Sequence, residues 1–309
     1  MAIASTTINK QRLVGVCALV VAAIAITAPA SADTISLSQL VLNGTAELLS
    51  PNLLRLAPNV ETNPGGDPPA GSAWTPTRVP VATPWTASFD FQMSDPALDA
   101  ILDADGSGGD GLAFLIQNDP FFGTSALGRG AGGMGFLGVY NSVAVMFDTY
   151  QNNAAYGDPN GNYIAVNTRG TDLNVPHHFC TDGQLTTDPS LVDLPDQTCT
   201  DDPVLGMTTA IPRLDGPVHN ATVTYEPGLM HVFLDGLLAL SVPIDLASTI
   251  SLAGGSDAFL GFTAGTRFSY QNHDILDFSY AAVPEPSMMA LAAVVAAGLL
   301  RRKMRGGSR

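Results

Sequence analysis

Four residues with oxygen-bearing groups are closely spaced in one segment of this chain. They are Asp148, Tyr150, Asn152 and Asp158. Calcium takes about 6–8 oxygen ligands from carboxylates, amides, backbone carbonyls and water. Two carboxylates, the Asn152 amide and the backbone carbonyl of Tyr150, completed by water, can form such a shell. The spacing therefore predicts one calcium site in this segment.

This segment is expected to be a loop between two β-strands. Residues 142–150 alternate so that Val143 and Phe147 point to one face of a strand and Asp148 points to the other. Residues 163–167 are typical of a second strand on the far side of the loop. The first strand would therefore bring Asp148 to its end, next to the oxygen ligands of the loop.

An all-β domain is predicted for the body of the chain. Turn signals are frequent, and no long stretch shows the 3.6-residue period of a helix. The predicted strands are Ser88–Met93, Leu112–Gln117, Ser142–Tyr150, Tyr163–Asn167, Ala221–Tyr225, Met230–Leu234, Phe259–Thr263 and Asp274–Tyr280. Two stacked antiparallel sheets would bury the alternating apolar positions of these strands, and Trp74 and Trp85 are expected in that core.

Residues 1–32 are predicted to be a secretory signal peptide. Lys10 and Arg12 precede an apolar run, and Ala30-Ser31-Ala32 supplies a cleavage site of small residues. The mature chain would begin at Asp33 and be exported.

Residues 283–309 carry a second signal. Pro284-Glu285-Pro286 is followed by the apolar segment 288–300 and then by a basic cluster. A tail anchor is one interpretation, although the apolar segment is short for a stable membrane span. The order of these features resembles the PEP-CTERM sorting signal of Gram-negative bacteria. That resemblance implies processing by an exosortase during export, with transient membrane contact through residues 288–300.

The body between these two signals is strongly acidic. Residues 33–282 contain six arginines, no lysine and 27 acidic residues, which gives a formal net charge of about −21. Such a surface repels phosphate backbones, so nucleic acid is excluded as a partner. The negative charge is explained equally well by a solvated acidic surface suited to a salty exterior as by any specific role.

Two cysteines, Cys180 and Cys199, remain once Cys17 leaves with the signal peptide. In an exported chain such a pair predicts a disulfide. The neighbouring His177 and His178 allow a zinc site as an alternative, but a covalent bridge would consume both sulfur ligands.

Seven segments of the body carry motifs in a characteristic order. They are Leu40–Ala46, Ser88–Phe91, Gly109–Phe114, Gly132–Gly138, Ser142–Val166, Phe262–Gly265 and His273–Phe278. These motifs and their order resemble the L-type (legume-like, concanavalin A-like) lectins. The resemblance implies a concanavalin A-like jelly-roll β-sandwich over residues 33–282, in which calcium fixes the loop that binds a sugar.

The resemblance also implies a set of sugar-binding residues. Asp110 and Asn152 would bind sugar hydroxyls, Gly135 would donate its backbone N–H, and Tyr150 would offer its ring. Residues 265–272 would form the rim. In the family the aspartate at the place of Asp110 follows a cis peptide bond, which here would be the bond from Gly109.

One departure from the family concerns its second, transition-metal site. The family has a carboxylate where this chain has Met146 and a histidine where it has Tyr163. A thioether and a phenol are poor replacements among hard oxygen ligands. We therefore expect calcium alone, in one site.

Three functions are compatible with the sequence. The favoured one is a calcium-dependent, non-enzymatic lectin that binds a glycan at the cell surface or in the extracellular polysaccharide matrix. A polysaccharide-cleaving glycoside hydrolase or lyase on the same fold is the second. Glu47, Glu61 and Glu226, the only glutamates of the body, form no paired pattern for such an enzyme. A structural matrix protein with a decayed sugar site is the third.

Overall fold

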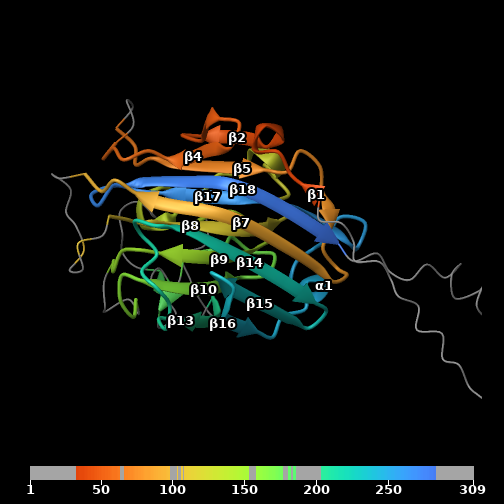
Figure 1. Ribbon diagram of the computed structural model, residues 1–309. Coiled ribbons are helices and arrows are strands. Elements are labelled where there is room, and N and C mark those ends of the chain that lie inside the picture. Colours follow the sequence, from red (N-terminus) through yellow and green to blue (C-terminus); the bar gives the residue numbers. More distant parts are fainter. Residues whose placement is uncertain are drawn as a thin grey trace, which may run out of the picture.

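Two antiparallel β-sheets stacked face to face form the protein (Figure 1). The computed structural model describes residues 33–62, 66–97, 103, 106, 108–152, 158–176, 180–181, 184–185 and 203–282. The first sheet has the strand order β16 (Leu237–Val242), β15 (Leu229–Leu234), β14 (Val218–Glu226), β7 (Trp85–Ser94), β18 (Asn272–Ala282), β4 (Leu53–Ala57) and β3 (Glu47–Ser50), with β1 (Asp33–Thr34) beside β18.

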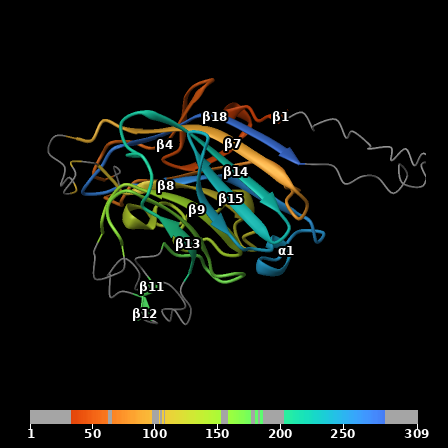
Figure 2. The same ribbon diagram turned by 60° about the horizontal axis from the view of Figure 1, so that its bottom comes forward.

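The second sheet lies behind the first in Figure 1. Its order is β13 (Val204–Thr208), β10 (Tyr163–Thr168), β9 (Ser142–Asp148), β8 (Gly111–Gln117), β17 (Asp257–Gly265), β5 (Ala70–Trp74) and β2 (Val41–Gly44), with β6 (Val79–Pro80) beside β17. The predicted all-β jelly-roll β-sandwich is confirmed. A two-stranded ribbon of β11 (Cys180–Thr181) and β12 (Gln184–Leu185) lies apart from both sheets (Figure 2).

The main hydrophobic core fills the space between the sheets. On β7 the odd-numbered residues from Trp85 to Met93 are buried and face this core, as the period-two alternation predicts. Phe89 lies at its centre, with ring centroids 5.5 Å from Phe114, 5.9 Å from Phe147 and 4.9 Å from Phe262. Such aromatic contacts fix the two sheets against each other.

A second, smaller core lies on the outer face of the second sheet. It includes Trp74, Leu115, Phe136 and Met146. Strands β8 and β9 are therefore buried on both faces, which explains why their sequences read as continuous apolar runs. Trp85 belongs to the main core, so the burial predicted for both tryptophans is confirmed.

Short helices and tight turns connect the strands. The helices are the 3-10 turns η1 (Leu37–Gln39), η2 (Gly123–Ser125) and η3 (Ala131–Gly133) and the single α-helical turn α1 (Leu246–Thr249). The predicted turn at Asp235-Gly236 joins β15 to β16, and both residues have positive φ, 50° and 77°. Among the described residues, no helix is long and apolar enough to cross a membrane.

Several predictions concern residues outside the described part of the chain. The signal peptide 1–32, the tail 283–309, His177, His178 and Cys199 all lie there. The disulfide between Cys180 and Cys199 and the boundaries of the two signals therefore stay predictions.

One buried histidine makes the fold sensitive to acid. His273 on β18 pairs with Met93 of β7 and Ala57 of β4 and has no exposed surface. Burial, assisted by the charge of Arg55, lowers the pKa of His273 from 6.5 to about 3. The unfolded chain thus binds the proton more tightly than the folded one. The stability from neutral His273 is complete above the unfolded pKa and is lost as the pH falls toward the folded value.

We predict that His273 alone lowers the free energy of unfolding by about 2 kcal/mol between pH 7 and pH 5. Urea denaturation at these pH values should show a correspondingly smaller loss in His273→Leu. The matched control is His231→Leu, on the half-exposed face of β15, which should keep the wild-type pH dependence. Equal pH dependence in His273→Leu and the wild type would contradict the prediction.

Candidate functional site

Asp148 ends strand β9 and has no solvent-exposed surface. Its Oδ1 accepts a hydrogen bond from the backbone N–H of Tyr150, 2.9 Å away. Its Oδ2 is buried and has no hydrogen-bond partner in the described part of the chain. Burial raises the pKa of Asp148 well above its ordinary value, and repulsion from Asp158 and Asp110 raises it further.

Asp158 lies on the other side of the same loop and fixes two of its neighbours. Its Oδ2 accepts from the backbone N–H of Asn152 at 2.9 Å, and its Oδ1 accepts from the Tyr163 hydroxyl at 2.6 Å. Tyr163 is paired with Asp148 across β9 and β10. Burial raises the pKa of Tyr163 well above its ordinary value, so the phenol stays protonated and can donate.

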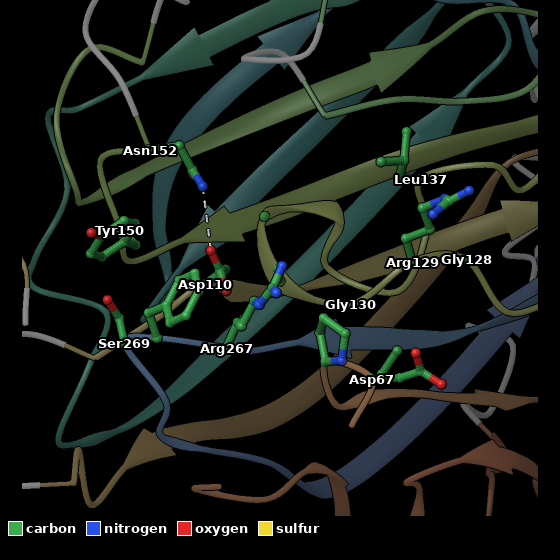
Figure 3. A pocket seen from close by; sticks show the side chains of 15 residues that line it. Asp67, Asp110, Gly128, Arg129, Gly130, Leu137, Tyr150, Asn152, Arg267 and Ser269 are labelled. Carbon is green, nitrogen blue, oxygen red and sulfur yellow. Dashed lines mark hydrogen bonds between the residues drawn. The ribbon is translucent and has the colours of Figure 1, made fainter. Parts of the chain in front are cut away.

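Asn152 connects this loop to the residue predicted to bind sugar. Its Nδ2 donates to Asp110 Oδ1 at 3.4 Å, the bond dashed in Figure 3. Its Oδ1 is buried and has no hydrogen-bond partner among the described residues. The amide nitrogen of Asn152 thus faces Asp110, while its amide oxygen accepts from no described donor.

The oxygen atoms around Asp148 form a set of possible ligands that fits a hard divalent cation. Asp148 Oδ2 and Asn152 Oδ1 are buried acceptors that no described donor satisfies. A cation bound to them would satisfy both atoms and favour the charged form of Asp148. No group of three or more His, Cys, Asp or Glu side chains in the described ranges could hold a metal ion. Such a site would therefore use two carboxylates, the amide, a backbone carbonyl and water.

The two positions at which the family has transition-metal ligands make other contacts here. Met146 lies in the smaller core, where its sulfur accepts a hydrogen bond from Asn167 Nδ2 at 3.2 Å. The Tyr163 hydroxyl donates to Asp158, as described above. Asp158 is thus oriented by a phenol.

A cavity of about 520 Å³ opens next to Asn152 (Figure 3). Of the predicted sugar-binding residues, Asp110, Tyr150 and Asn152 line it. The remaining lining consists of the segment 128–132, Leu137, the segment 267–269, and Asp67, Pro68 and Ala70. The cavity is therefore built from five separate segments at one end of the second sheet, which lie at 67–70, 110, 128–137, 150–152 and 267–269.

Asp110 is held at the floor of this cavity by the backbone. The peptide bond between Gly109 and Asp110 is cis, as the resemblance implied. The backbone N–H of Asp110 donates to Gly265 O at 3.1 Å, and the Thr266 hydroxyl donates to Gly109 O at 2.5 Å. A Cβ at Gly109 would lie 2.7 Å from Tyr150 Cβ. Glycine is therefore required for the close approach of the two loops.

Gly135 departs from its expected position. It is buried, does not line the cavity, and its N–H donates to Arg129 O at 2.8 Å. The position is packed closely against β17, since a Cβ at Gly135 would lie 2.7 Å from Ala264 O. The glycine loop instead presents Gly130 and Gly132 to the cavity.

Two arginines line the cavity, and the sequence analysis assigned a role to neither of them individually. Arg129 lies just before the glycine-rich segment Gly132–Gly138, and Arg267 lies within the predicted rim 265–272. The Arg267 guanidinium lies over the ring of Phe268, 4.6 Å from its centroid. Half of Phe268 is exposed, so this pair forms part of the mouth of the cavity.

Comparison with known proteins agrees with this architecture. The sequence model of the legume lectin domain matches residues 35–293, and that of the PEP-CTERM protein-sorting motif matches residues 282–305. The Ca2+/Man-bound exoplasmic/lumenal domain of VIP36 is similar over 79% of this chain and 83% of its own, with 18% identity and a TM-score of 0.53. Winged bean acidic lectin complexed with methyl-α-D-galactose is similar over 82% of this chain and 100% of its own, with 19% identity and a TM-score of 0.56.

We predict that Tyr163→Phe lowers the free energy of unfolding by about 1.5–3 kcal/mol, because it removes a buried hydrogen bond to a carboxylate. Urea denaturation in chelator measures this loss. Tyr140→Phe is the control, because the hydroxyl of the half-buried Tyr140 makes no hydrogen bond to the described residues. A Tyr163→Phe variant as stable as the wild type would show that the phenol does not hold Asp158.

Proposed function

Because the chain belongs to the legume lectin domain family, we propose that it is an exported, calcium-dependent lectin that binds a glycan in the cavity beside Asp110. Members of this family bind carbohydrates and are not enzymes. The observation that carries the proposal is the position of Asn152. Its amide nitrogen donates to Asp110 in the cavity, while its oxygen, which has no hydrogen-bond partner among the described residues, would bind the ion together with Asp148.

Calcium dependence is supported by the chemistry of that donor set. Asp148, Asp158, the Asn152 amide and the Tyr150 carbonyl would hold the ion. It would compensate the buried charge of Asp148, which otherwise has no cation among the groups that shift its pKa. The same loop carries the Tyr150 ring and the Asn152 amide that line the cavity. Binding of the ion would therefore order the groups that contact the sugar.

The cavity offers the groups that a sugar requires. The carboxylate of Asp110 can accept from hydroxyls, and the Asn152 amide can both donate and accept. The ring of Tyr150 supplies an apolar surface for the C–H face of a sugar ring. In place of Gly135, the backbone at Gly130 and Gly132 would contribute the polar main-chain groups.

The two structural neighbours suggest first probes. The VIP36 domain was obtained with Ca2+ and mannose, and the winged bean lectin with methyl-α-D-galactose. A glycan array that contains mannosides and galactosides, read in calcium and again in chelator, tests both parts of the proposal. A chain that binds no glycan under either condition would instead be a structural protein with this fold.

The proposed location is the cell surface or the extracellular polysaccharide matrix. The match to the PEP-CTERM protein-sorting motif supports export and processing of the C-terminal end. We predict that mass spectrometry of the mature protein from its native host finds a C-terminus before Arg309. An intact Arg309 in the exported protein would contradict processing.

We predict that Asp148→Ala abolishes binding of both calcium and sugar, because it removes the buried carboxylate whose Oδ2 has no described hydrogen-bond partner and would bind the ion. Asp110→Ala should abolish sugar binding and leave most of the calcium affinity intact. Calorimetric titration with calcium, and then with a sugar identified on the array, separates the two effects.

The matched control is Asp172→Ala, an exposed carboxylate that follows β10 at the opposite end of the strand from the site. It should bind calcium and sugar as the wild type does. Unchanged sugar affinity of Asp148→Ala in chelator would show that calcium does not organise the site.

A further inference from the structure

We propose that the glycan bound in this cavity carries a carboxylate, as a hexuronate does, and that Arg267 binds that group, with Arg129 adding positive charge to the same cavity. The inference rests on the proposed lectin function and adds the class of sugar to it. It depends on the placement of arginines in an otherwise acidic protein, and not on the calcium loop.

Four of the six arginines of the body are bound to other groups of the protein. Arg55 forms a bidentate ion pair with Asp274, with both N–O distances 2.8 Å, and Arg213 pairs with Asp215. The remaining two donate to neutral acceptors: Arg78 donates to Asn118 Oδ1 at 2.7 Å, and Arg169 donates to Leu173 O at 3.4 Å.

Arg129 and Arg267 differ from these four. Neither guanidinium makes a hydrogen bond or an ion pair with the described residues, and both line the cavity. The body has 27 acidic residues for its six arginines, so carboxylates are plentiful. Two cations that pair with no described carboxylate and line the same cavity therefore indicate a site at which an external anion can bind.

The guanidinium of Arg267 is positioned to bind such an anion. Its guanidinium lies over the Phe268 ring, and its Nε is buried without an acceptor among the described residues. Stacking on an aromatic ring fixes the plane of the guanidinium, which then presents its terminal nitrogens in a fixed direction. In the view of Figure 3 these nitrogens are turned into the cavity, and Arg129 lies on the side away from Tyr150.

The charge of the lining agrees with this assignment. Two carboxylates, Asp67 and Asp110, and two guanidinium groups line the cavity. Asp67 is exposed at the rim, and Asp110 is hydrogen-bonded to the Asn152 amide. The lining is therefore neutral in a body of net charge about −21.

A carboxylate is the anion that this geometry favours. A planar guanidinium binds a planar carboxylate through two parallel N–H···O bonds, and such charge-assisted bonds are stronger than bonds to a neutral hydroxyl. A neutral hexose has a CH2OH group where the corresponding hexuronate has a carboxylate. The two sugars differ at that position alone and can be compared directly.

The experiment titrates the full mature protein in calcium buffer at 0.15 M ionic strength with matched methyl glycosides. The pairs are galacturonoside against galactoside, glucuronoside against glucoside, and mannuronoside against mannoside, and galactoside 6-sulfate is added as a second anion. For at least one pair we expect the uronoside to bind about tenfold more tightly than its neutral parent. Arg267→Gln should reduce this preference to less than about threefold, and Arg129→Gln should reduce it less.

The matched control is Arg78→Gln, which removes the same charge at the other end of the sandwich and should keep the full preference. Neutral glycosides that bind as well as the uronosides would overturn the inference and leave the lectin function standing. A preference that survives in Arg267→Gln, or binding of the sulfate alone, would also overturn it. If no glycoside binds, the proposed function falls together with the inference.

Discussion

The burial of one carboxylate governs this structure. Asp148 lies at the end of a strand that is buried on both faces, and its Oδ2 has no donor in the described part of the chain. An isolated buried charge is costly unless it is paired or coordinated. The loop that follows supplies part of the compensation, because the backbone N–H of Tyr150 donates to Asp148 Oδ1 and that of Asn152 donates to the neighbouring Asp158.

The second, smaller core explains how the loops that line the cavity are held close to one another. Phe136 and Met134 cover the outer face of the second sheet, and the chain that carries them also forms the glycine loop of the cavity. Close approaches then fix the loops to one another. A Cβ at Gly111 would lie 2.4 Å from Phe147 O, so the segment that bears Asp110 is packed directly on the strand that bears Asp148.

The strongly patterned strands could be predicted from the sequence, and the irregular ones could not. β7 alternates, and β9 is a continuous apolar run, so both are evident. β5 consists of Ala, Gly, Ser, Ala and Trp, and it lies so close to the other sheet that a Cβ at Gly71 would be 2.0 Å from Leu56 O. Asp148, Tyr150, Asn152 and Asp158 lie in one short segment, so their spacing could be recognised in the sequence as that of a possible calcium site. Which glycine faces the cavity is decided by packing against β17, and sequence spacing contains no such information.

The arginines of the cavity illustrate how short-range contacts and long-range electrostatic repulsion can have opposite effects on the binding of an acidic polysaccharide. A body of net charge about −21 repels an acidic polysaccharide at a distance. Salt at physiological strength screens that repulsion beyond about 8 Å. The Arg267 guanidinium would act within hydrogen-bond range inside a partly enclosed cavity, where screening is weaker. The acidic surface would thus oppose non-specific adsorption to anionic polymers, while the cavity selects a single carboxylate at contact. Specificity for an acidic sugar therefore requires no basic surface, only guanidinium groups in the cavity that pair with no described carboxylate.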